Sequence, residues 1–161
     1  MNIKRFTLSI TAAAAVLAAA VPMASADRDE QRPTKREIRA QFDRWNAALR
    51  TGDAAKVADL YARDAVLLAT VDNEPNDTRA EIVDYFENHF LPSKPVGRIT
   101  ESIVKVLDED SAIDQGTYQF RLTAADGTVS TVKARYTYVY ERDARGQWKI
   151  VHHHSSKYPK S

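Results

Sequence analysis

The sequence predicts an α+β domain in which about three helices pack on one face of a strongly curved, mostly antiparallel sheet. Two observations carry this prediction. Residues 34–91 show helical periodicity with capping residues, whereas residues 98–156 alternate polar and apolar side chains as strands do. Short turn-forming segments separate the strands, so consecutive strands are expected to pair. A sheet curled around helices leaves an open end, and we expect an internal pocket there.

Each helix is predicted from its start signal. Residues 34–37 (TKRE) form the pattern of a capping box, and an apolar stripe with helical spacing follows as far as Leu49. Asp53 can cap a second, shorter helix. Residues 78–81 (TRAE) repeat the capping-box pattern, and this third helix is expected to end before Pro92.

The strands are predicted from two-residue alternation between turn signals. The expected ranges are 65–71, 99–107, 112–122, 129–141 and 147–156. In the fourth strand Tyr136, Tyr138 and Tyr140 share one face. In the fifth strand alternation places Trp148, Ile150, His152 and His154 on one face and Lys149, Val151 and His153 on the other. An aromatic face that extends over two strands must be covered by another part of the protein.

The start of the chain has the features of a secretory signal. A basic pair, Lys4 and Arg5, precedes an apolar run at residues 10–21 and the small-residue cleavage pattern at residues 24–26. The apolar run is too short for a typical membrane span. An uncleaved anchor is the alternative, but cleavage after residue 26 leaves a polar start. The predicted segments are a signal peptide at 1–26, a flexible lead-in at 27–33 and one domain at 34–158.

Composition narrows the possible partners and the location. Removing the first 26 of 161 residues leaves 135 residues, which suffice for one core, with 21 basic and 22 acidic side chains. A chain with such a charge balance lacks the excess of basic residues that binds nucleic acid or anionic lipid. We therefore expect no nucleic-acid partner and no membrane association after signal cleavage. The sequence has no cysteine, which excludes disulfides and thiol catalysis. The mature protein is expected to be periplasmic or secreted.

Four segments, taken in order, carry a resemblance to a known family: residues 51–53 (TGD), 85–88 (YFEN), 93–96 (SKPV) and 146–156 (GQWKIVHHHSS). They resemble the association (hub) domain of calcium/calmodulin-dependent protein kinase II, over most of residues 34–158. That domain belongs to the nuclear-transport-factor-like, cystatin-like superfamily. The resemblance implies a cystatin-like cone, a homo-oligomerising module and a small-molecule pocket. It does not imply a kinase, because the sequence has no glycine-rich phosphate loop, catalytic lysine strand or H-R-D loop.

The candidate pocket residues are histidines and tyrosines of the predicted strands. His152 and His154 would lie on one face about 6.6 Å apart, so both could contact one ligand. Tyr118 and Tyr138 would offer hydroxyl groups at the pocket wall, although packing or a dimer interface would explain them equally well. A metal would need a third ligand that no H-x-x-E or H-E-x-x-H pattern supplies. We therefore expect no metal and no cofactor.

Arg135 completes the set of candidate pocket residues. In the kinase hub, arginines of the sheet line the pocket, and the resemblance places their positions near Tyr118 and Tyr138 in this sequence. Arg135 lies within an apolar strand, where an unpaired charge is costly. Its expected partner is Asp114 on the neighbouring strand, a second subunit or an anionic ligand.

The expected function is a secreted homo-oligomerising module that binds a small molecule, with itself as its main partner and without kinase activity. The alternative is an enzyme of the same fold, similar to ketosteroid isomerases or polyketide cyclases, with a pocket His, Asp or Tyr as acid or base. The sequence does not select a catalytic residue among these types. Fold alone does not separate the two hypotheses, because this scaffold supports many functions.

Overall fold

The computed structural model describes residues 32–159, so the predicted signal peptide and most of the predicted lead-in lie outside the described residues. Within this range, no helix has the length and apolar character needed to cross a membrane. The helices are α2 (Lys35–Arg50), α3 (Ala54–Ala58), α4 (Arg79–Asp84), the π-helix η1 (Tyr85–Phe90) and the 3-10 helix η2 (Leu91–Ser93). The strands are β1 (Tyr61–Leu68), β2 (Val96–Val106), β3 (Ser111–Thr123), β4 (Val129–Arg142) and β5 (Trp148–Lys157). The predicted α+β order is confirmed.

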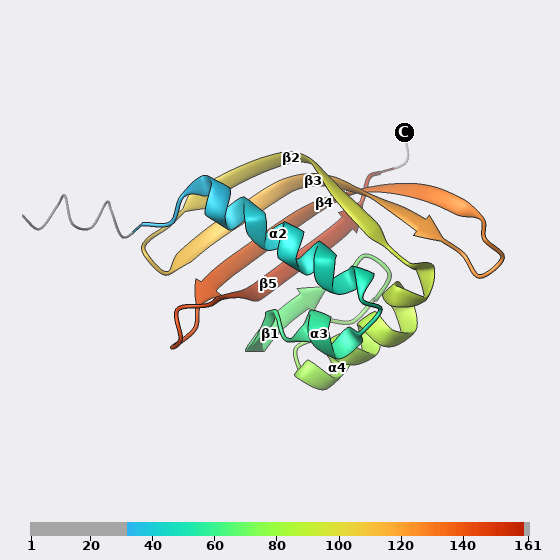
Figure 1. Cartoon of the computed structure of the whole chain (residues 1–161), viewed down its shortest axis with the longest axis horizontal. Coiled ribbons are helices and arrows are strands. Elements are labelled where there is room, and N and C mark those ends of the chain that lie inside the picture. Colours follow the sequence, from blue (N-terminus) through green and yellow to red (C-terminus); the bar gives the residue numbers. More distant parts are fainter. Residues whose placement is uncertain (1–31, 160–161) are drawn as a thin grey trace, which may run out of the picture.

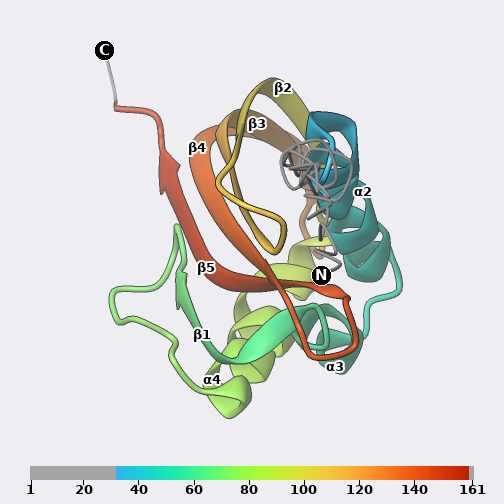
Figure 2. The same cartoon turned by 90° about the vertical axis from the view of Figure 1, so that its left-hand side faces the viewer.

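All five strands form one sheet in the order β1-β5-β4-β3-β2. Strands β2 to β5 are antiparallel neighbours, whereas β1 joins β5 in parallel. The sheet is strongly curved, and α2 lies along its concave side (Figures 1 and 2). The shorter helices α3 and α4 lie near β1 (Figure 1). The curved sheet with helices on one face agrees with the prediction.

The start of α2 differs from the predicted capping box in one half. Thr34 accepts a hydrogen bond from the backbone N–H of Glu37 at 3.2 Å, as a cap should. The Glu37 carboxylate does not return to the cap. It accepts from Nε1 of Trp148 at 2.9 Å and from Arg142 at 3.0 Å. The prediction of a complete capping box was wrong here, because a guanidinium and an indole N–H from distant strands bind the Glu37 carboxylate.

The third predicted helix begins as expected and then changes its geometry. Thr78 and Glu81 form the complete capping box at the start of α4. After Asp84 the chain widens into a π-helix, and a 3-10 turn containing Pro92 ends the segment. Helical periodicity does not reveal such a change, because the π turn shifts side chains by only part of a turn. π-Helical turns are rare in proteins, and those that occur often lie at functional sites.

The core on the concave side of the sheet is largely aromatic. Trp45 of α2 is 2% exposed and lies at its centre. Its ring centroid is 6.1 Å from those of Phe86 and Phe120, and 5.9 Å from that of Tyr138. Most of these pairs meet edge to face, which is a favourable arrangement of aromatic rings. The contacts join α2, the π-helix and the sheet into one packed unit.

A bulge in β5 changes which histidine faces inward. Tyr140 pairs with Ile150 and Val139 pairs with His152, so Val151 is an extra residue without a partner on β4. An extra residue inverts the faces of the following positions. His153 therefore points to the concave side with Trp148 and Ile150, whereas His152 and His154 point outward. The prediction that His152 and His154 share a face with Trp148 and Ile150 was wrong for this reason.

Candidate functional site

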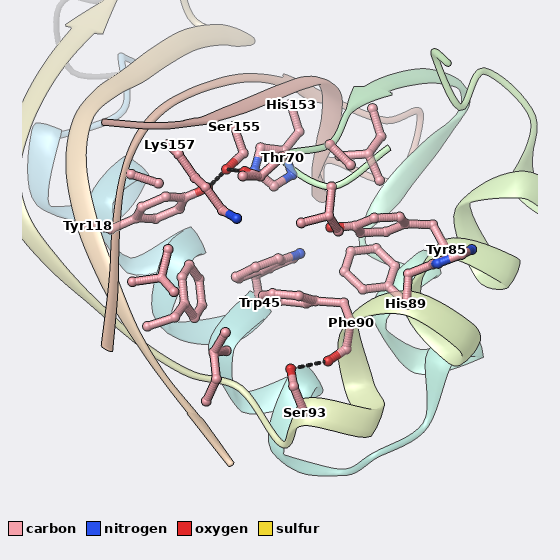
Figure 3. A pocket seen from close by; sticks show the side chains of 18 residues that line it. Trp45, Thr70, Tyr85, His89, Phe90, Ser93, Tyr118, His153, Ser155 and Lys157 are labelled. Atoms are coloured by element: carbon pink, nitrogen blue, oxygen red, sulfur yellow. Dashed lines mark hydrogen bonds between the residues drawn. The ribbon is translucent and has the colours of Figure 1, made fainter. Parts of the chain in front are cut away.

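A cavity of about 190 Å³ lies between α2, the π-helix and the concave face of the sheet (Figure 3). Its volume is close to that of an engineered apolar cavity of about 150 Å³ that holds benzene. No aspartate or glutamate is among its lining residues. Most of its wall is apolar, with side chains from both layers of the fold: Leu67, Phe86, Phe90, Phe120, Leu122 and Val132. The cavity therefore has the size and character to enclose one apolar ring.

His153 is the buried polar residue of this wall, with 3% of its surface exposed. The Tyr138 ring stacks on the imidazole with centroids 4.1 Å apart, and Trp45 meets it edge-on at 5.6 Å. Burial lowers the pKa of His153 to about 3, because the charged imidazolium would lose its hydration, and His152 and His154 add a smaller effect. The imidazole is therefore neutral at physiological pH.

A chain of hydrogen bonds fixes the tautomer of this imidazole. Nε1 of Trp45 lies 3.2 Å from the Tyr61 hydroxyl, and this hydroxyl lies 2.9 Å from Nδ1 of His153. An indole N–H can only donate, so the Tyr61 oxygen accepts from it. Among the described residues Nδ1 of His153 is then the one acceptor left for the Tyr61 proton, and we assign this proton to the Tyr61–Nδ1 hydrogen bond. The ring proton of His153 is then on Nε2. This atom has no hydrogen-bond partner among the described residues.

Three hydroxyl groups form a second polar feature of the wall. The Tyr118 hydroxyl donates to Oγ of Ser155 at 2.5 Å, and Ser155 is hydrogen bonded in turn to Oγ1 of Thr70. Burial raises the pKa of Tyr118, so the phenol keeps its proton. Figure 3 shows the ammonium group of Lys157 directed toward the cavity from the same strand as Ser155.

The predicted pocket residues separate into two groups in the structure. Tyr118 lines the cavity. Tyr138 is fully buried behind it, on the other side of the His153 ring. Arg135 is exposed on the convex face, where it is paired with Thr117 and Ser156. His152 and His154 lie on the same convex face because of the bulge, so these three residues do not line the cavity.

Asp114 does not pair with Arg135, contrary to the expected ion pair. Its carboxylate is buried and accepts from Ser102 at 2.7 Å and from the Tyr136 hydroxyl at 3.1 Å. Burial raises the pKa of Asp114, and the two hydrogen bonds oppose this rise. The two residues are on opposite faces because Asp114 pairs with Tyr138, an inward position, and Arg135 is outward.

Several wall residues were not among the candidates taken from the sequence. They are Thr70, His153, Ser155 and Lys157, together with Tyr61 behind them. The run of three histidines did draw attention to this strand. Strict alternation, however, assigns His152 and His154 to the pocket, whereas His153 lines the cavity. Nothing in the local sequence marks Val151 as a bulge. Within residues 32–159, no three histidine, aspartate or glutamate side chains come together as a metal site.

The curved sheet and the helices on its concave side define the cystatin-like fold that nuclear-transport-factor-like proteins share. A nuclear-transport-factor-like protein with a cystatin-like fold from Novosphingobium aromaticivorans is 18% identical, with a TM-score of 0.65, over 79% of this chain and 83% of that chain. Residues 34–159 match the family described as calcium/calmodulin dependent protein kinase II association domain. The chain belongs to this family.

Solved structures agree with this assignment. A protein from Xanthomonas campestris, described as an association domain of the same family, is 53% identical over 80% of this chain and 91% of that chain, with a TM-score of 0.77. A ketosteroid isomerase-like protein from Erwinia carotovora is 19% identical over 76% of this chain and 95% of that chain, with a TM-score of 0.63, and shares the fold alone. A comparison with the curated proteins found no match.

Proposed function

We propose that this protein is a secreted association module that forms homo-oligomers and binds a small, mainly apolar molecule in its cavity, without kinase activity of its own. The observation that carries the proposal is the convex face of the sheet. The family match supports self-association, because association domains typically self-oligomerise. The cavity supports ligand binding by its size and its apolar walls.

Two adjacent rows of side chains cross the convex face over all five strands. Register places Lys105, Ile113, Val139, His152 and Val66 in the first row. It places Ile103, Gln115, Thr137, His154 and Leu68 in the second row. None of these ten residues is buried in the single chain, and Ile103 is 50% exposed. A broad exposed surface rich in aliphatic side chains is typical of an interaction site.

A second copy of the chain fits this surface. Lys105, at the β2 edge, is the one lysine, arginine, aspartate or glutamate in the two rows, so two copies can approach without strong like-charge repulsion. A two-fold axis parallel to the face, in the plane of contact, would bring this surface of one copy against the same surface of the other, which is the isologous contact of most homodimers. Aliphatic side chains such as Val139 would form its centre.

Sedimentation velocity of the mature protein at micromolar concentrations tests the oligomer. The wild type should sediment as a dimer or a larger species, and Val139→Asp should shift it to monomer because a carboxylate would be buried at the centre of the interface. Thr131→Asp is the matched control, since Thr131 is exposed near the far end of the same strand. A monomeric wild type would contradict self-association.

Secretion is the part of the proposal that rests on residues 1–26. Expression of the full-length chain in a Gram-negative host, followed by cell fractionation, should recover the mature protein outside the cytoplasm. N-terminal sequencing should then begin at Asp27, directly after the predicted cleavage site. Recovery of the uncleaved chain in the cytoplasm would contradict this part of the proposal.

An enzyme of the same fold is the second candidate, and one observation favours it. His153 lies at the cavity wall and is hydrogen bonded to Tyr61, as a catalytic pair could be. However, a pKa of about 3 makes this imidazole a weak base at neutral pH. Among the described residues that line the cavity, none carries a carboxylate that could take that role. The binding module is therefore the function that this geometry supports better.

A further inference from the structure

We propose that the cavity selects a single-ring molecule that carries acceptor oxygens along one edge, an inference that rests on the proposed ligand-binding role. The selecting feature is a row of hydrogen-bond donors on β5, formed by His153, Ser155 and Lys157. These alternate residues follow the bulge, lie on the concave side and all line the cavity. Successive members are about 6.6 Å apart along the strand.

The first donor is Nε2–H of His153. Its ring is held on one side by Tyr138 and at Nδ1 by Tyr61. Neither of these two tyrosines lines the cavity, whereas His153 does. Nε2 itself has less than 1 Å² of accessible surface, so a ligand atom reaches it only after a small movement of the imidazole or of a neighbouring wall side chain. A buried N–H without a partner is destabilising, and an acceptor atom of a ligand would remove that cost.

The second donor follows from counting hydroxyl protons. Tyr118, Ser155 and Thr70 have three protons but share only two hydrogen bonds. Because Tyr118 donates to Ser155, one proton of the Ser155–Thr70 pair is used between these two and the other is left over. Thr70 and Ser155 both line the cavity, so either hydroxyl can donate this proton to an acceptor there.

The third donor is the ammonium group of Lys157, which reaches the cavity from the exposed end of the row (Figure 3). An ammonium group has three donors and no acceptor. No salt bridge to Lys157 is found among the described residues. An acceptor at this end of the ligand would be bound more strongly if it were a carboxylate.

The opposite wall is mostly apolar. Phe86, Phe90 and Phe120 form much of it. Ser93 lies on this side, but its hydroxyl already donates to the Phe90 carbonyl at 2.7 Å. Tyr85 and His89 also line this side, and burial raises the pKa of Tyr85, so its hydroxyl keeps its proton and is a further donor. A fitting ligand therefore has an apolar body with most of its acceptor oxygens on the side that faces β5.

Three probes of similar shape test this inference on the mature protein at pH 7.5: ethylbenzene, acetophenone and benzoate. Calorimetric titration, followed in parallel by tryptophan fluorescence, measures each dissociation constant. Acetophenone should bind about tenfold more tightly than ethylbenzene, because one buried hydrogen bond contributes about 1–1.5 kcal/mol. Benzoate should bind at least as tightly as acetophenone, because it also reaches Lys157.

Variants of the row then measure what each donor contributes to binding of the three probes. His153→Phe keeps an aromatic ring against Tyr138 and should remove the advantage of acetophenone while ethylbenzene still binds. Lys157→Met keeps most of the side-chain stem and should weaken benzoate alone. Circular dichroism and thermal melting verify the fold of each variant. If His153→Phe does not fold, the double variant Ser155→Ala with Lys157→Met tests the same row.

The outcomes separate this inference from the proposed function. If ethylbenzene binds as tightly as acetophenone and benzoate, the donor row does not select the ligand, and the ligand-binding role stands without it. If none of the three probes binds, the cavity does not take single-ring molecules, and both the ligand-binding role and the inference are overturned. Loss of selectivity in the variants with ethylbenzene binding retained supports the inference.

Discussion

The phenol ring of Tyr138 lies against the imidazole of His153, with centroids 4.1 Å apart and an angle of 24° between the ring planes. The two residues are direct partners across β4 and β5. Their contact depends on the extra residue Val151, because without it His153 would point to the convex face. The bulge and the stacked pair together place a neutral imidazole at the wall of the cavity.

The stability of the protein should fall as the pH is lowered toward 4. The pKa of His153 is about 3 in the folded state, against about 6.5 in an unfolded chain. Between these values the unfolded chain binds more protons, so the free energy of unfolding rises with pH, by up to about 1.4 kcal/mol per pH unit from this residue. The lowered pKa of His152 acts in the same direction, and the raised pKa of Asp114 acts against it.

Urea denaturation at pH 7.5, 6.5 and 5.5 measures this dependence. The wild type and His154→Gln, an exposed control, should show similar slopes of unfolding free energy against pH. The slope should be clearly smaller in His153→Phe, which cannot be protonated. Equal slopes in all three proteins would show that another group causes the dependence.

Gly116→Ala should destabilise the protein much more than Gly127→Ala. A Cβ at Gly116 would lie 2.2 Å from the carbonyl oxygen of Glu101, a backbone atom of the paired strand. Such a clash should cost about 3 kcal/mol or more. Gly127 has open space around its Cβ position, so its backbone φ of +85° is the main penalty, about 1–2 kcal/mol. Thermal melting of both variants checks the order, and similar losses would contradict it.

Glu37→Ala should destabilise the contact between α2 and the β4–β5 hairpin. Nε1 of Trp148 loses its acceptor, and Arg142 loses its ion pair with Glu37 but keeps the longer one with Asp110 at 3.8 Å. We expect a loss of about 1 kcal/mol, since the carboxylate is partly exposed and solvent weakens the ion pair. Chemical denaturation measures this loss, with Glu87→Ala as the control on an exposed helical position. A loss no larger than that of the control would contradict the role of Glu37.

Thr78→Ala should weaken the start of α4 by about 1 kcal/mol, the usual contribution of an N-cap side chain. The Thr78 hydroxyl accepts from the N–H of Glu81, and the Glu81 carboxylate returns to Thr78. Thr78→Ser, which keeps the hydroxyl, should retain most of the stability. Hydrogen exchange of the amides at the start of α4 reports the change locally, and unchanged exchange would contradict it.

Local sequence patterns predicted the architecture because each pattern acts within its own segment. Caps at Thr34, Asp53 and Thr78 begin the three α-helices, and all three side chains accept the expected hydrogen bond. Alternation likewise identified the four antiparallel strands. The parallel pairing of β1 with β5 has no such local signature, since it joins segments far apart in the sequence.

The site was harder to predict for the same reason. One residue, Val151, inverts the faces of all positions that follow it, so the cavity receives His153, Ser155 and Lys157 in place of His152 and His154. Glu37 shows a similar effect, because partners from distant strands displace a local capping contact. The register between β3 and β4 is regular throughout, so alternation placed Tyr118 correctly on the concave side.

The loop that follows β1 affects whether other chains can add strands to this edge of the sheet. Leu67 and Asn76 exchange two backbone hydrogen bonds, of 2.8 and 3.0 Å, and β1 is the outermost strand of its side of the sheet. The amide and carbonyl groups of Leu67 are thereby occupied, so a foreign strand cannot extend the ladder at this position. This arrangement disfavours fibril-like growth from that border and is compatible with a finite, closed assembly.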